Sequence, residues 1–116
     1  MIKLNPYEFI DLANKLVEDQ DYLDEPRYRT VISRIYYGTI HLLMLIKKIS
    51  IRDINRFHYE LIQKLKLIDI SLGGWIENLK EKRVKADYYL NQRVGKSVVE
   101  EAYKLFKRIE QKIDEY

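Results

Sequence analysis

The stretch Thr30 to Ile49, TVISRIYYGTIHLLMLIKKI, decides the fold expected for this chain. Drawn as a helix it is apolar on nearly every side, and Leu42 to Ile46 form an unbroken apolar run. A helix of this kind is normally enclosed by other helices. At about 1.5 Å per residue it would be about 30 Å long, the span of a small domain. Because Ser33, Arg34 and His41 interrupt it, it is too polar to cross a membrane. The stretch therefore predicts the central helix of a bundle.

Helix start signals occur before this stretch. Asn5 is a side-chain cap, Pro6 suits the first helical position, and Glu8 completes a capping-box pattern. Asp24 is the predicted cap of the central helix, followed by acidic residues in its first turn. The chain therefore begins with one short helix and continues into the long central one.

Three further helices are predicted after the central one. Apolar residues recur at helical spacing from Phe57 to Ile68, from Trp75 to Leu90, and from about Lys96 onwards. Ser71 to Gly74 holds the only glycine pair and predicts a break, and Asn91 to Gly95 predicts another. We therefore expect one domain over residues 1–116. Its fold class is all-α, an up-and-down four-helix bundle with an additional short helix.

Composition excludes several kinds of site. The 116 residues include no cysteine, so neither a disulfide nor a thiolate metal site can form. No histidine and acid cluster has metal-ligand spacing, and no glycine-rich loop follows a strand, so we expect no metal and no cofactor. The opening MIKLNPYEF lacks the apolar core and cleavage site of a signal peptide. We expect a cytoplasmic protein with no membrane partner.

The net charge of +3 is unevenly distributed along the chain. Residues 1–46 carry five basic and seven acidic side chains, residues 47–96 twelve and six, and residues 97–116 four and five. A basic middle segment would attract a polyanion such as RNA. Lysine-rich helical surfaces also serve solubility alone, so both interpretations remain open.

The polar residues of the central helix need partners. Arg34, Tyr37 and His41 share one stripe, and burying an unpaired guanidinium would be very costly. Arg34 must therefore reach solvent or meet an acid from another helix, and Asp87 is the candidate. Arg83 can pair with Asp87 along their own helix. It can equally face solvent or an anionic ligand while Asp87 points inward to Arg34. An Arg34–Asp87 pair would either fix helix register or take part in function.

Two motifs in these helices, taken together, resemble the HEPN domain family. One is Ser33-Arg34-x-Tyr36-Tyr37 on the second helix, and the other is Arg83-x-x-Ala86-Asp87-Tyr88 on the fourth. Either motif alone is weak, but both at this separation in an all-helical chain are fairly specific. The resemblance covers essentially the whole chain, including helix order and size.

The resemblance implies a homodimer whose subunits form a cleft. It also implies genomic pairing with a minimal nucleotidyltransferase in a toxin–antitoxin or related defence system. On this basis the protein is expected to bind that partner, a nucleotide or RNA. The predicted cleft or ligand-binding residues are Arg34, Tyr37, Arg83, Asp87 and Tyr88.

Many members of the family are metal-independent endoribonucleases that use an arginine followed four to six residues later by histidine. After Arg83 this chain instead has Asp87, Tyr88 and Tyr89. Neither an aspartate nor an ordinary tyrosine replaces imidazole as an acid–base group near neutral pH. No catalytic residue is therefore assigned, and a binding module is expected rather than an enzyme.

Two alternatives stay open, a metal-independent endoribonuclease and a purely structural dimerisation module. Arg34 and His41 have six residues between them, close to the catalytic spacing, but they lie on the central helix, and we interpret the match as coincidence. His58 is expected to be a surface or partly buried histidine without a catalytic partner.

Overall fold

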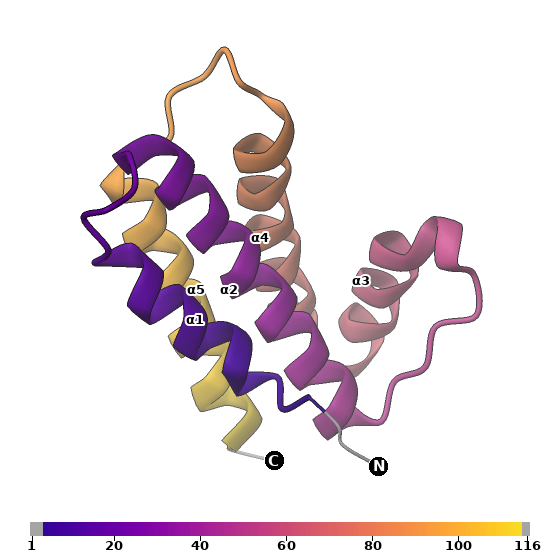
Figure 1. Ribbon diagram of the computed structural model, residues 1–116. Helices are drawn as coiled ribbons and strands as arrows, with labels where there is room; N and C mark the ends of the chain where they lie inside the picture. The colour runs from indigo at the N-terminus through magenta and orange to yellow at the C-terminus, as the bar shows by residue number, and fades with distance from the viewer. Residues whose placement is uncertain (1–3, 115–116) are drawn as a thin grey trace.

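The computed structural model describes residues 4–114, which form helices and connecting loops with no strand. The elements are α1 (Tyr7–Val17), α2 (Asp24–Lys47), the short 3₁₀ helix η1 (Ile54–Arg56), α3 (Phe57–Ile68), α4 (Ile70–Tyr88) and α5 (Lys96–Asp114). In Figure 1, α1, α2, α4 and α5 run alternately up and down beside one another, and α3 stands to one side, next to α4. The predicted all-α bundle with an additional short helix is confirmed.

The long helix α2 lies at the centre of the bundle, as predicted. It packs against α1, α4 and α5, and Ile32, Ile35 and Leu43 are fully buried. The prediction that it is enclosed on every side is wrong near its C-terminal end. There Leu45 is 66% exposed and Ile46 is 43% exposed. Leu45 and His41 line an open groove beside Leu4, Pro6 and Phe9, where α1 begins.

The two predicted helix starts differ in outcome. The Asn5 side chain accepts a hydrogen bond from the Tyr7 N–H at 3.0 Å, and the Glu8 carboxylate accepts one from the Asn5 N–H at 2.8 Å. The capping-box prediction is therefore confirmed. Asp24, however, is already the first residue of α2, and its carboxylate pairs with the buried Arg27 at 2.9 Å instead of capping the helix.

The break predicted at Ser71 to Gly74 is wrong, because α4 begins at Ile70 and continues through both glycines. The true boundary is Asp69, whose carboxylate accepts hydrogen bonds from the first turn of α4. A Cβ atom at Gly73 would lie 2.9 Å from the backbone nitrogen of Lys66 and 3.0 Å from its Cα. The glycine therefore permits α3 and α4 to approach closely. At Gly74 an added Cβ would meet nothing within 4 Å.

These two neighbouring glycines should respond oppositely to alanine. Gly74→Ala should raise the free energy of unfolding by up to about 1 kcal/mol, since alanine favours the helix and has room. Gly73→Ala should lower it by about 1–3 kcal/mol, since the new methyl group overpacks against the Lys66 backbone. Urea denaturation of both variants and the wild type measures the difference. Stabilisation by both substitutions would contradict the close approach of the two helices.

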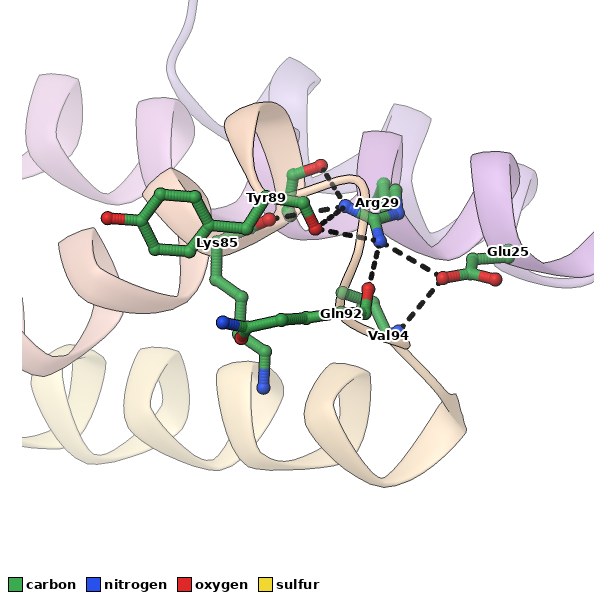
Figure 2. A network of polar contacts seen from close by, with 7 residues as sticks. Glu25, Arg29, Lys85, Tyr89, Gln92 and Val94 are labelled. Atoms are coloured by element: carbon green, nitrogen blue, oxygen red, sulfur yellow. Dashed lines mark hydrogen bonds and ion pairs between the residues drawn. The ribbon is translucent and has the colours of Figure 1, made fainter.

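The loop after α4 is held by Arg29 of α2, as Figure 2 shows. The Arg29 side chain is only 11% exposed, and it forms an ion pair with Glu25 at 3.0 Å. The Glu25 carboxylate also accepts a hydrogen bond from the Val94 N–H at 3.1 Å. That bond, followed by the one from Arg29, lowers the pKa of Glu25. Arg29 further donates to the carbonyl oxygens of Lys85, Ala86, Tyr89 and Gln92. The C-terminal end of α4 is thereby fixed against α2.

Candidate functional site

Aromatic side chains separate α2 from α3. Both helices are fully described, and no Cα atom of one lies within 8 Å of a Cα atom of the other. Tyr36 and Tyr37 extend from α2 towards His58 of α3, with ring centroids 5.4 Å and 6.2 Å from the imidazole. Phe57 packs edge-on against the same imidazole at 5.3 Å. The side of α2 that faces α3 is therefore lined by rings.

Arg83 of α4 is buried among these rings. Its guanidinium lies 5.4 Å from the ring centroid of Tyr36, 5.7 Å from that of Tyr37 and 5.8 Å from that of Tyr88. At these distances each ring face attracts the cation. The one carboxylate of residues 4–114 that pairs with Arg83 is that of Asp87, at 3.5 Å. The Nε atom of Arg83 is buried and has no hydrogen-bond partner in this range.

The pairing proposed for Arg34 is therefore wrong. Asp87 pairs with Arg83 one turn earlier on the same helix, where i, i+4 side chains are neighbours. The expectation that Arg83 faces solvent is also wrong, because only 6% of it is exposed. The local pair forms because its two residues are placed together by the helix itself, whereas Arg34 belongs to α2.

Arg34 of α2 also lies close to Tyr37. Its guanidinium is 5.5 Å from the Tyr37 ring centroid and 5.9 Å from that of Phe9, and it donates a hydrogen bond to the Ser33 hydroxyl at 3.3 Å. Its Nε atom is also buried without a partner. Two guanidinium groups thus lie within 6 Å of the centroid of one tyrosine ring. We call the connected set the arginine–tyrosine cluster; it comprises Arg34, Tyr36, Tyr37, Arg83, Asp87 and Tyr88.

The cluster brings all five residues predicted from the sequence into one chain of contacts. Tyr37 touches both arginines, and Arg83 touches Asp87 and Tyr88. Tyr88 is 67% exposed, so the chain of contacts runs from a buried guanidinium to the protein surface.

His58 is partly buried, as expected, but the sequence interpretation did not identify its hydrogen-bond partner. Its Nδ1 lies 2.6 Å from the hydroxyl oxygen of Tyr36, which is completely buried. The buried Tyr36 hydroxyl has no other hydrogen-bond partner among residues 4–114, so we assign it as the donor of this bond and Nδ1 as the acceptor. Burial raises the pKa of Tyr36, which keeps the hydroxyl protonated. The neutral imidazole then carries its own proton on Nε2. Burial, followed by the charges of Arg83 and Lys80, lowers the pKa of His58 and favours this neutral form.

A signal for His58 does exist in the sequence. It stands three, four and seven residues before Leu61, Ile62 and Leu65, which are all buried on one face of α3. A histidine at that register position faces the core, where it must find a hydrogen-bond partner.

His41 lies elsewhere. It is exposed and stacks on the ring of Phe9 with centroids 5.9 Å apart, beside a groove of about 300 Å³ that also includes Leu4, Pro6 and Leu45. Arg34 contacts the same Phe9 ring, but no hydrogen bond joins His41 to any residue from 4 to 114. The matching spacing of Arg34 and His41 therefore produces no direct contact between them.

Two general findings concern the described part of the chain. Among residues 4–114, no three histidine, aspartate or glutamate side chains are grouped so that they could hold a metal ion. None of the helices in this range combines the length and the apolar character needed to cross a membrane.

Comparisons of the chain with models of known protein families, with curated proteins and with solved structures found no match. The function is therefore inferred from the chemistry of the arginine–tyrosine cluster and its neighbours.

Proposed function

We propose that the chain is a HEPN-type binding module that recognises phosphate groups of a nucleotide or an RNA through the arginine–tyrosine cluster. The observation that carries this proposal is the charge imbalance around Tyr37. Arg34 and Arg83 both lie close to its ring, and Asp87 supplies the one carboxylate of residues 4–114 that pairs with either of them. A desolvated cation without a full partner is unfavourable, and a bound anion would relieve that cost.

The donors left over on the two arginines suit a phosphate. A guanidinium carries several N–H groups in a rigid fork that matches phosphate oxygens. Within residues 4–114, Arg34 has one side-chain hydrogen bond, to Ser33, and Arg83 has one, to Asp87 at 3.5 Å. The exposed ring of Tyr88 at the edge of the cluster offers a face on which a base can stack.

The protonation of His58, the histidine nearest to the arginine–tyrosine cluster, supports binding of RNA better than its cleavage. RNA cleavage by a histidine requires a nitrogen that can accept a proton from the attacking hydroxyl. The lone pair of His58 Nδ1 accepts the hydrogen bond from Tyr36, and its Nε2 carries a proton. In this state His58 has no free nitrogen that could accept the proton, so it does not replace the histidine that is missing after Arg83.

The proposal extends to partners. The two sequence motifs support a homodimer and a minimal nucleotidyltransferase partner in a toxin–antitoxin or defence system. Exposed apolar side chains on α2, Leu45 and Ile46, provide a surface on which another protein chain could pack.

The test compares ligand binding by the wild type and Arg34→Gln. Arg34 is only partly buried, so this variant is expected to fold. Fluorescence anisotropy with a labelled single-stranded RNA and calorimetry with AMP should show about tenfold weaker binding, the equivalent of about 1.4 kcal/mol. RNA affinity of the wild type should also fall with salt.

The matched control is Arg108→Gln, which removes an exposed arginine of α5 and should leave affinity unchanged. If both variants bind the ligands equally more weakly than the wild type, the loss of affinity comes from the change in net charge and not from the loss of Arg34 in particular. If the purified protein cuts the RNA in the presence of a chelator, the endoribonuclease alternative replaces this proposal. If neither RNA nor AMP binds, the structural dimerisation module replaces it.

A further inference from the structure

A surface hollow of about 380 Å³ adjoins the arginine–tyrosine cluster through His58. The hollow lies where η1 and the start of α3 face α4. It is lined by Ile54, Asn55, Arg56, Phe57, His58, Tyr59 and Lys80. Five of these side chains can donate hydrogen bonds, two of the five are cationic, and none of the seven is a carboxylate.

The two cations of the hollow have no acidic partner in residues 4–114. Arg56 lies over the ring of Tyr59 at 4.5 Å, and neither Arg56 nor Lys80 forms an ion pair with a described residue. The neighbouring acids are already engaged. The Asp53 carboxylate accepts from the Asn55 N–H at 3.0 Å, and Glu60 pairs with Lys64 at 3.1 Å. Both cations of the hollow are therefore without an ion-pair partner among residues 4–114.

His58 adds a fixed donor to this hollow. Because the Tyr36 hydroxyl occupies Nδ1, the imidazole has its remaining N–H on Nε2. A ring held in one tautomer by a buried partner offers a hydrogen bond of defined direction. The lining thus combines one oriented N–H with two cationic groups, a combination suited to a tetrahedral anion.

We infer that this hollow is a phosphate-binding subsite in which His58, Lys80 and Arg56 hold a phosphate group of the nucleotide or RNA ligand. The inference rests on the proposed function, since it gives a second phosphate of the same ligand a place next to the arginine–tyrosine cluster. His58 joins the two sites, because Tyr36 contacts both His58 and Arg83.

Occupation of the subsite should change the protonation of His58. The groups facing the imidazole are Tyr36 and Tyr37 from α2, and Arg83 and Lys80 from α4. These groups include two cations and no carboxylate. A phosphate at Nε2 supplies the missing negative charge and should raise the pKa of His58 towards its ordinary value.

The test follows the two histidine rings by nuclear magnetic resonance during titration with inorganic phosphate. The chain has only two histidines, so His41 is an internal control. The ring signals of His58 should shift and saturate, its pKa should rise, and the signals of His41 should stay in place. The ring nitrogen shifts should also show the Nε2–H tautomer before phosphate is added.

Lys80→Gln should weaken phosphate binding at least about tenfold, whereas Lys104→Gln, an exposed change on α5, should not. Thermal melting confirms that both variants fold. Unmoved His58 signals, or equal affinity of the Lys80 variant and the wild type, would overturn the subsite. If the subsite is overturned but Arg34→Gln still weakens RNA binding, the proposed function is retained without the phosphate subsite.

Competing ligands distinguish whether the subsite binds a terminal phosphate or a phosphodiester of the RNA backbone. AMP and a 5′-phosphorylated RNA present a terminal phosphate, and the same RNA without the 5′-phosphate presents only internal diesters. Competition by the phosphorylated ligands alone identifies a terminal phosphate at the subsite. Equal competition by both RNAs identifies the backbone. Failure of all three ligands to displace inorganic phosphate would overturn the assignment to nucleotide or RNA.

Discussion

Replacing Leu42 by alanine should lower the free energy of unfolding by about 2–5 kcal/mol. Leu42 lies on α2 with only 4% of its surface exposed, within the core that α2 shares with its neighbours. Removing its side chain loses apolar burial and leaves a cavity that the surrounding helices can only partly close. Urea denaturation of the variant and the wild type measures this loss.

Leu45→Ala is the matched control on the same helix. Leu45 lies one turn further on and is 66% exposed, so its loss should change the free energy of unfolding by less than about 0.5 kcal/mol. The difference between the two variants tests which side of α2 faces the core. Equal losses at both positions would mean that another chain covers Leu45 under the conditions of the measurement.

Replacing Arg29 by methionine should cost about 1.5–3 kcal/mol, the range typical of losing hydrogen bonds from a charged donor. Arg29 holds Glu25 and four carbonyl oxygens at the C-terminal end of α4 and in the following loop. Hydrogen bonds to a charged donor are stronger than neutral ones, and methionine keeps the length of the side chain but none of its donors. Urea denaturation again measures the loss.

Arg108→Met is the control, because Arg108 is exposed on α5 and forms no ion pair with residues 4–114. It should change stability by less than about 0.5 kcal/mol. Glu25→Gln should cost less than Arg29→Met, since a glutamine carbonyl can still accept from the Val94 N–H. A small effect of Arg29→Met would mean that water replaces the guanidinium at those carbonyl oxygens.

Local sequence patterns predicted the helices well and their boundaries less well. The capping box at Asn5 and the start of α5 at Lys96 depend on neighbours in sequence, and both predictions are confirmed. The glycine pair misled because a turn and a close helix contact require the same residue. Only the position of the Lys66 backbone shows that Gly73 serves the second purpose.

The candidate site was predicted as a set of residues but not in its pairing. Arg83 and Asp87 pair because their helix brings them together, and the sequence already contained that information. The link between Tyr36 and His58 spans 22 residues and depends on how far α3 stands from α2. No pattern within one helix determines that distance, so the role of His58 could not be predicted in the same way.

The position of α3 beside α4 has one more consequence. The backbone of α3 approaches only α4 and η1 closely, and the Tyr36–His58 hydrogen bond ties it to the central helix. A segment attached in this way can open locally without unfolding the rest of the protein. An anion held by His58 and Lys80 would join α3 to α4 at a second point. Ligand affinity and the local stability of α3 would then be linked equilibria, in which each reinforces the other by the same free energy.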